Sequence, residues 1–382
     1  MDALKPPAAP EQGAPERPTA PKKDFFKHMT PRHRREKEWW IEDGQSRDLL
    51  ALLANRDKAT WDQVAVKVLN MVRCRDFIEY NTKTDLVRPT RFCMYNIAFF
   101  DLDKESVVVP RPPISKIPAS KFWCLEDSVN VISIKVTESD VGYPINVYGT
   151  ILARDEYDYR CIYLFKRGVD NPQLIMSPDD TLTLAGPFRA FAVTGSMFFE
   201  FHLKIKRVGL LVDQNLSKCL LQHNTSHHTR QPMTVSLESC LSTIVMVYSP
   251  VSAGVEASVE INILNGPSSF TGKVTACTTE SQGRMMILYD SEVSGTRKEL
   301  GTGGSVALTR RIVAVPLDEG LVLDVAHEAK CFEVTLWYED DVEECTLLLG
   351  PYELQVKVTW TAIERRRRPK MFEKIGDTYL LW

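Results

Sequence analysis

The sequence predicts a mainly β protein, an antiparallel β-sandwich made of two related β units, and three observations lead to this fold class. Apolar and polar side chains alternate in "FEFHLKIK" (199–206) and in "ELQVKVTW" (353–360), as in a strand with one buried and one solvated face. Further short apolar runs follow at close spacing, without amphipathic helices between them, which favours antiparallel sheets. Two stretches of the β region also match each other in order and spacing.

The remaining apolar runs of this region are expected to be strands as well. They occupy residues 129–136, 160–165, 181–184, 190–193, 243–248, 258–264, 273–277, 284–289, 304–308, 311–315, 321–325 and 332–338.

The chain before residue 127 is expected to be organised differently. Residues 1–30 are rich in Pro and Ala and cannot bury enough apolar surface to offset the entropy of ordering, so they predict a disordered tail. Residues 31–110 carry a helical pattern, with a T-x-x-Q capping box at Thr60, and end in a lead-in strand. The prolines at the start of 111–126 predict an extended linker.

The β-sandwich region is expected to span 127–362, duplicated as 127–215 and 240–362, with a basic C-terminal tail at 363–382. "YGTILARDEYDYRCIYLF" matches "TGKVTACTTESQGRMMILY", which aligns Gly149 with Gly272. "FEFHLKIK" matches "LDVAHEAK" in the same way, and the two intervals differ by one residue. A repeat of this length is domain-sized, so it indicates two versions of one β unit and not a solenoid.

Composition excludes several classes of protein. The net charge of −3, with 44% hydrophobic and 25% charged residues, is ordinary for a soluble globular chain and gives no overall attraction to nucleic acid or to anionic membranes. The nine cysteines contain no CxxC pair and are expected to be reduced core residues. No secretory signal or membrane span is recognisable, which predicts a cytoplasmic or nuclear protein.

The acidic segment "ARDEYDYRCIYLF" (153–165) is the first candidate site, because Asp155, Glu156 and Asp158 could bind a metal or act in catalysis. A calcium loop needs more ligands and a glycine at a fixed position, which this segment lacks. Its counterpart at 276–289 keeps the turn character but loses two of the three acids. We therefore expect these residues at the solvated tip of a hairpin.

Two further segments are candidate ligand sites. In "CLLQHNTSHHTRQ" (219–231), Cys219, His223 and His227 are spaced for one helix face and could bind zinc with His228 or Cys240, but the polar composition favours an inter-domain loop. "GTRKELGTGGS" (295–305) is glycine-rich like a phosphate loop. Such a loop must open a helix, whereas this one leads into a predicted strand.

These patterns predict no catalytic, cofactor-binding or metal-binding residue. No serine stands in a G-x-S-x-G elbow, and the clustered histidines form no recognisable base arrangement. An enzymatic role is left open but not favoured.

Two basic segments could contact nucleic acid or serve as nuclear-import signals. "PRHRREKEWW" (31–40) places arginines beside Trp39 and Trp40, although acidic residues are interleaved with them. Near the C-terminus a candidate basic contact patch is formed by Arg365, Arg366, Arg367 and Arg368.

Three phrases within 127–362 resemble a known family. "VNVISIKVTESDVGYPINVYGTILARDEYDYRCIYLFKR", "LTLAGPFRAF" and "LSTIVMVYSPVSAGVEASVEINIL" are similar to a grass-plant family of domains of unknown function that read A-R-D, then Y-L-F-x-R, then G-P-x-R. Similar domains occur downstream of ribosome-inactivating N-glycosidase domains in some cereal stress proteins. The E-A-x-R-type motif of those glycosidases is absent from this sequence.

The resemblance implies a non-catalytic plant β-sandwich module for protein interaction or ligand recognition, connected with stress or defence. Its partner would be a protein or a small ligand, with no cofactor and no membrane. Two alternatives stay open. The chain could be an accessory protein of rRNA N-glycosidase-type defence, or a nuclear or nucleic-acid-associated accessory protein. Oligomeric state and strand order cannot be read from the sequence.

Overall fold

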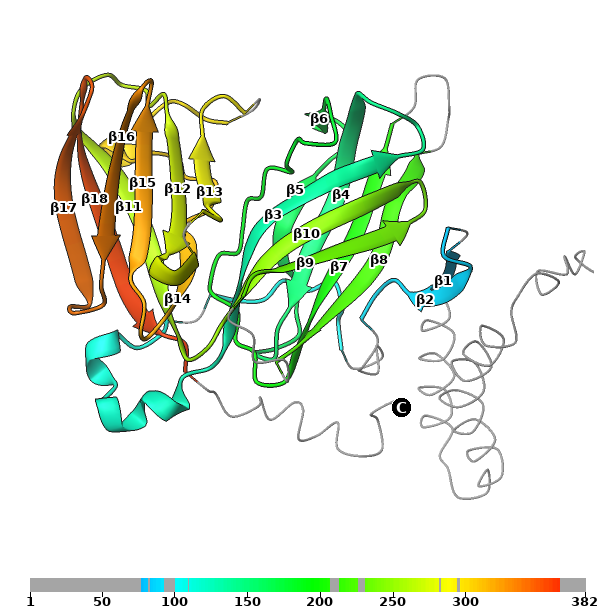
Figure 1. Cartoon of the computed structure of the whole chain (residues 1–382), viewed down its shortest axis with the longest axis horizontal. Coiled ribbons are helices and arrows are strands. Elements are labelled where there is room, and N and C mark those ends of the chain that lie inside the picture. Colours follow the sequence, from blue (N-terminus) through cyan, green and yellow to red (C-terminus); the bar gives the residue numbers. More distant parts are fainter. Residues whose placement is uncertain are drawn as a thin grey trace, which may run out of the picture.

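A computed structural model describes residues 77–81, 83–92, 100–108, 110–206, 213–225, 231–281, 283–293 and 296–364. This part of the chain forms two antiparallel β-sandwiches that stand side by side (Figure 1), which confirms the predicted fold class. The expected tail, the helical pattern up to residue 76 and the candidate patch from Arg365 to Arg368 lie outside the described residues. Among the described residues, no helix is long and apolar enough to cross a bilayer.

The N-terminal sandwich consists of one sheet with strand order β5-β4-β7-β8, where β6 also pairs with β4, and a second sheet with order β3-β10-β9. Phe199, Phe201 and Leu203 of β7 are buried between the sheets, as their alternation predicted. The strands are β3 (Ser128–Ser139), β4 (Ile145–Arg154), β5 (Ile162–Arg167), β6 (Gln173–Ile175), β7 (Ser196–Ile205), β8 (Gln214–Asn224), β9 (Met233–Ser239) and β10 (Ser242–Val251).

The C-terminal sandwich consists of sheets with the orders β13-β12-β15-β16 and β14-β11-β18-β17. Every second residue of β18 is buried, including Val358 and Trp360, and burying each such side chain is worth roughly 1.5–3 kcal/mol. The strands are β11 (Gly254–Asn265), β12 (Lys273–Thr278), β13 (Met286–Asp290), β14 (Ile312–Pro316), β15 (Leu321–His327), β16 (Lys330–Leu336), β17 (Val342–Leu349) and β18 (Tyr352–Ala362).

The two sandwiches repeat one topology, which confirms the prediction of two related units. Strands β5-β4-β7-β8 correspond to β13-β12-β15-β16, and β3-β10-β9 correspond to β11-β18-β17. The register is also the same, since Ala153 pairs with Phe199 and Ala276 pairs with Leu323. The N-terminal sandwich has no full strand that corresponds to β14 among its described residues. The segment at the equivalent place makes a single bridge, between Asp127 and Val193.

The aligned glycines explain why this register is fixed. A Cβ atom on Gly149 would collide with the backbone carbonyl oxygen of His202, and one on Gly272 would collide with that of Ala326. Gly149 also has a φ of 115°, a conformation that residues with a side chain rarely adopt. Both positions therefore require glycine where the neighbouring strand approaches closely.

The structure places the division between the units later than the sequence pattern suggested. β10 ends at Val251 and β11 begins at Gly254, so the described residues of the interval 216–239 belong to the N-terminal sandwich, mainly as β8 and β9. The expected inter-domain loop at 219–224 is thus a strand at the edge of its sheet, with Gln222 and Asn224 on its exposed face and His223 buried on the other. The expected strands 181–184, 190–193 and 304–308 make only single bridges to the sheets.

The segment expected as a linker (111–126) packs against the C-terminal sandwich. It forms two short 3₁₀ helices, η2 (Ile114–Lys116) and η3 (Ala119–Cys124), seen in cyan below that sandwich in Figure 1. Ile114 and Leu125 are buried in the core of the C-terminal sandwich.

The two sandwiches are fixed to each other by polar and apolar contacts. The Asn130 amide donates to the carbonyl oxygen of Ala314 at 2.7 Å and its oxygen accepts from the Ala314 N–H at 2.9 Å, as a strand partner would. Apolar side chains from both units pack beside this pair, including Ala192, Val251 and Ile312.

Upstream, β1 (Ile78–Asn81) and β2 (Leu86–Pro89) form a short hairpin next to the N-terminal sandwich. Phe92, Phe100 and Leu102 pack with Tyr159 and Phe198 of that sandwich. The described residues before the β region are therefore docked onto it.

Candidate functional site

Charged side chains that could take part in binding or catalysis lie in two regions, the acidic segment after β4 and a cleft between the sandwiches. In the first, Asp155 is completely buried and Asp158 is nearly so, which makes the expected position at a solvated hairpin tip wrong. Asp155 accepts hydrogen bonds from Nη1 of Arg189 at 2.5 Å and from its Nη2 at 3.0 Å. It also accepts the Ala192 N–H at 2.8 Å. The carboxylate of Asp155 is thus fully used within the fold.

Asp158 belongs to the same buried cluster. Its Oδ2 accepts the hydroxyl of Ser106 at 2.8 Å, and Ser106 in turn accepts from Nη2 of Arg189 at 2.9 Å. Burial raises the pKa of Asp158 above its ordinary value, against the hydrogen bonds from Arg160 and Ser106 that lower it. Ser106 therefore connects the upstream segment to both acids.

Glu156 has a third structural role. Its carboxylate accepts the backbone N–H groups of Thr194, Gly195 and Ser196 at 2.8–3.0 Å. These donors lie directly before and at the start of β7, so Glu156 holds the loop that leads into the strand.

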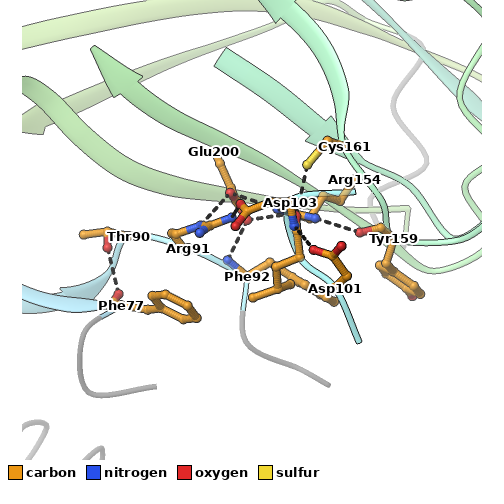
Figure 2. Close-up of polar contacts among 11 residues, drawn as sticks. Phe77, Thr90, Arg91, Phe92, Asp101, Asp103, Arg154, Tyr159, Cys161 and Glu200 are labelled. Atoms are coloured by element: carbon orange, nitrogen blue, oxygen red, sulfur yellow. Dashed lines mark hydrogen bonds and ion pairs between the residues drawn. The ribbon is translucent and has the colours of Figure 1, made fainter. Parts of the chain in front are cut away.

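A second buried ion pair joins Arg154 to Glu200 (Figure 2). Arg154 donates from Nε at 2.7 Å and from Nη2 at 3.2 Å to the two carboxylate oxygens of Glu200, a bidentate pair. Its Nη1 and Nη2 also donate to the backbone oxygens of Tyr159 and Leu102 at 3.0 and 2.8 Å. Glu200 further accepts the Phe92 N–H at 2.8 Å. Every donor nitrogen of this guanidinium has a partner.

These contacts show what the charged residues of the A-R-D and G-P-x-R phrases do in the fold. The aspartate of A-R-D (Asp155) pairs with the arginine of G-P-x-R (Arg189), and the arginine of A-R-D (Arg154) pairs with Glu200. Both pairs attach the upstream residues to the N-terminal sandwich through Leu102 and neighbouring groups. None of these charged groups lines any of the three cavities described for this structure. The acidic segment is therefore a structural clamp.

The Cys–His segment does not form the zinc site that a helix would have allowed. Cys219 and His223 lie four residues apart on β8, which separates them by about 13 Å along a strand. His223 is buried, and its Nδ1 lies 3.3 Å from the hydroxyl of Tyr248. Burial raises the pKa of the Cys219 thiol to about 12, so it is not a reactive thiolate.

Within the ranges that the structure describes, no three His, Cys, Asp or Glu side chains are arranged to hold a metal ion. His227 and His228 lie outside those ranges.

The glycine-rich segment at 295–305 is also not a phosphate loop in its described part. Glu299 bridges to Ser269 and Ser305 bridges to Asn262, so the segment runs along the C-terminal sandwich. The strand expected at 304–308 is not formed, and β14 begins only at Ile312; the single 3₁₀ turn of the segment offers no helix end for an anion.

The second region is a cleft of about 340 Å³ between the two sandwiches. One wall is the outer face of the β3–β10 sheet, where Ser133 pairs with Val247, together with the segment from Thr181 to Leu184. The other wall comes from β13 and its flanking residues in the C-terminal sandwich. The cleft is lined by Ile132, Ser133, Thr181, Leu182, Thr183, Leu184, Val247, Gly283, Arg284, Met285, Ile287, Asp290, Val293, Thr296, Thr309 and Arg310.

Arg310 is the buried charge of this cleft. Its side chain reaches across the junction, where Nη2 donates to the carbonyl oxygen of Val131 in β3 at 2.7 Å. Its Nε has no hydrogen-bond partner. Burial lowers the pKa of Arg310 to about 10, and this residue still carries its charge at neutral pH. No sequence motif marked Arg310, since the adjacent Arg311 is the same residue type and is exposed.

Comparisons with known proteins give a family but no activity. No curated protein matches the chain. Solved structures with distant likeness include human GIVD cytosolic phospholipase A2, with 6% identity over 63% of this chain and a TM-score of 0.21, where the match spans 30% of the phospholipase chain. A pair of C2 domains from extended synaptotagmin 2 matches with 8% identity over 69% of this chain and 96% of theirs, with a TM-score of 0.23.

A family model, described as a domain of unknown function, matches residues 128–358. The match begins with β3 and ends within β18, so the family unit contains both sandwiches and the cleft between them. The chain therefore belongs to the family of the domain of unknown function DUF6598.

Proposed function

We propose that this protein is a non-catalytic recognition module that binds a small ligand in the cleft between its two sandwiches. The observation that carries this proposal is the cleft itself. Its volume of about 340 Å³ lies in the range of small-molecule sites, which often occur at domain junctions. Its lining is largely apolar, with hydroxyl groups from Ser133, Thr183 and Thr296 and one buried arginine, Arg310.

The cleft is suited to recognition because its walls are held in place without a ligand. The reciprocal hydrogen bonds of Asn130 with Ala314 and the apolar cluster that contains Val251 and Ile312 fix the two sandwiches. A preformed site loses little conformational entropy on binding, which favours affinity.

The biological setting is proposed on the sequence phrases alone. Their similarity to a grass-plant family supports a role in stress or defence, and the neighbouring N-glycosidase domains of some relatives support the accessory-protein alternative. The nucleic-acid alternative rests on Arg365 to Arg368, which lie outside the described residues.

The proposal can be tested by blocking the cleft. Val247→Trp places an indole in the cleft, whereas Val245→Trp places it further along the same half-buried face of β10, at a residue outside the cleft lining. We expect at least one member of a panel of small aromatic acids, amides, amines and phosphates to raise the melting temperature of the wild type and of the Val245→Trp variant. The same compound should leave the Val247→Trp variant unchanged. A panel that stabilises none of the proteins, or all three equally, would contradict binding in the cleft.

A further inference from the structure

Arg310 differs from the other deeply buried arginines by the lack of a carboxylate. It is 3% exposed, and among the described residues no Asp or Glu forms an ion pair with it. Its Nη2 contacts the Val131 oxygen and, at 3.8 Å, the Met286 sulfur, which is only a weak acceptor. Nε makes no hydrogen bond at all. A buried cation of this kind is costly unless something pairs with it.

Arg154 shows what completes such a guanidinium. Its Nη2 donates to a backbone oxygen, that of Leu102, as Nη2 of Arg310 donates to Val131. In Arg154 the Nε and Nη2 edge then holds the carboxylate of Glu200 in a bidentate pair. The Nε on the same edge of Arg310 has no hydrogen-bond partner, so a planar carboxylate is the group whose geometry fits it.

The surroundings of Arg310 select the rest of the ligand. The cleft offers apolar contacts from Leu184, Val247 and Ile287 for a hydrocarbon body. The hydroxyl of Thr296 also has no hydrogen-bond partner, which leaves a second polar group for the ligand. These groups lie on both sandwiches, so one small molecule can contact the two units together.

The charge balance of the cleft favours a single negative charge. Its charged lining residues are Arg284, Asp290 and Arg310. Arg284 is exposed, and Asp290 already pairs with Lys273 at 3.1 Å. A ligand with one carboxylate would neutralise Arg310, which is the buried charge of this lining.

We propose that the ligand of this cleft is a small amphipathic monocarboxylate, whose carboxylate binds the Nε edge of Arg310 and whose apolar body lies between the sandwiches. This inference rests on the proposed function and names the chemical class of the molecule recognised. The sulfur of Met286, a flexible side chain, lies 3.8 Å from Nη2 beside this edge.

Three matched probes test the assignment by titration calorimetry of the full chain: 3-phenylpropanoate, its neutral primary amide and 2-phenylethyl phosphate. We expect the carboxylate to bind the wild type roughly tenfold or more tightly than the amide, because a hydrogen-bonded buried charge pair discriminates at this level. The phosphate should bind more weakly than the carboxylate. Arg310→Gln should remove the preference for the acid over the amide, whereas Arg311→Gln, at the adjacent exposed arginine, should keep it.

Arg310→Lys provides a second variant in case the glutamine variant does not fold. It keeps the charge but loses the planar edge, so it should reduce the preference without abolishing it. Equal binding of acid and amide, with both blocked by Val247→Trp, would leave the proposed function standing and overturn the carboxylate assignment. Tighter binding of the phosphate would overturn the assignment as well. Absence of binding by all three probes would count against the function and the ligand class together.

Discussion

The two sandwiches share one topology but treat their buried arginines differently. In the N-terminal sandwich, Arg154 and Arg189 are each held by a bidentate carboxylate, from Glu200 and Asp155. In the C-terminal sandwich, Arg310 is equally buried but has a backbone oxygen and a sulfur as its contacts. A repeated β unit therefore contains both a completed and an incomplete version of the same kind of site.

This difference suggests separate roles: the paired arginines stabilise the fold, and the unpaired arginine serves recognition. The completed pairs attach Phe92, Leu102 and Ser106 to the N-terminal sandwich and line none of the described cavities, so their consequence is structural. The incomplete one lines a cleft at the junction of the units. Because an unpaired buried charge lowers stability, its presence is more readily explained by a ligand than by folding.

The largest effect is expected for Glu200→Gln, which keeps the shape of the side chain but leaves Arg154 buried without a counter-charge. We expect the free energy of unfolding to fall by about 3–5 kcal/mol, measured by urea denaturation. Glu105→Gln is the matched control, since the Glu105–Lys166 pair also joins the upstream segment to the N-terminal sandwich but both side chains are 57% exposed. That variant should lose less than about 1 kcal/mol. Equal losses in both variants would show that burial does not determine the strength of these pairs.

A smaller loss is expected for Asp155→Asn. Arg189 keeps the hydrogen bond to Ser106 and the nearby charge of Asp158, at 3.9 Å, so its charge is not left alone. We expect a loss of about 2–3 kcal/mol in urea denaturation. A double variant with Asp158→Asn should lose more free energy of unfolding than the two single variants together, because neither acid then remains to pair with Arg189. Strict additivity would mean that the two acids do not share Arg189.

The sequence predicted the fold class and the repeat, because the alternation of apolar residues is a local signal and the two stretches match in order when Gly149 is aligned with Gly272. It missed the strands β8, β9 and β17, whose exposed faces look like loops in composition. Edge strands carry fewer apolar residues than central ones, so periodicity alone does not mark them.

The site was harder to predict because its partners are distant in sequence. Asp155 meets Arg189 across 34 residues, and nothing within "ARDEYDYR" shows that its acids are buried. One signal was available: Arg154 directly follows the buried run that ends at Ala153, and an arginine there needs an acid. Arg310 gave no signal, since its burial depends on β3 of the other sandwich.

In the absence of ligand, Arg310→Met should not lower the free energy of unfolding as Glu200→Gln and Asp155→Asn do. Replacing an unpaired buried cation with an apolar side chain of similar length removes the cost of desolvation, at the expense of one hydrogen bond to Val131. We expect the free energy of unfolding to stay unchanged or to rise by about 1 kcal/mol, again in urea. A loss comparable to that of Glu200→Gln would show that Arg310 is a structural residue and would remove the contrast between the sandwiches.

The smallest change in the free energy of unfolding is expected for Asp158→Asn, and the sign of this change depends on pH. Burial raises the pKa of Asp158, so folding favours the protonated acid and this carboxylate costs stability above its folded pKa. The asparagine variant mimics the protonated form at every pH. At neutral pH it should therefore be as stable as the wild type to within about 1 kcal/mol, or slightly more stable.

As the pH falls through the raised pKa of Asp158, the wild type should gain stability relative to the asparagine variant. Urea denaturation of both proteins between neutral pH and about pH 5 measures this difference, a range in which an ordinary aspartate stays mostly ionised. If the difference does not change over this range, Asp158 does not titrate there, and the ion pair with Arg189 controls its charge more strongly than burial does.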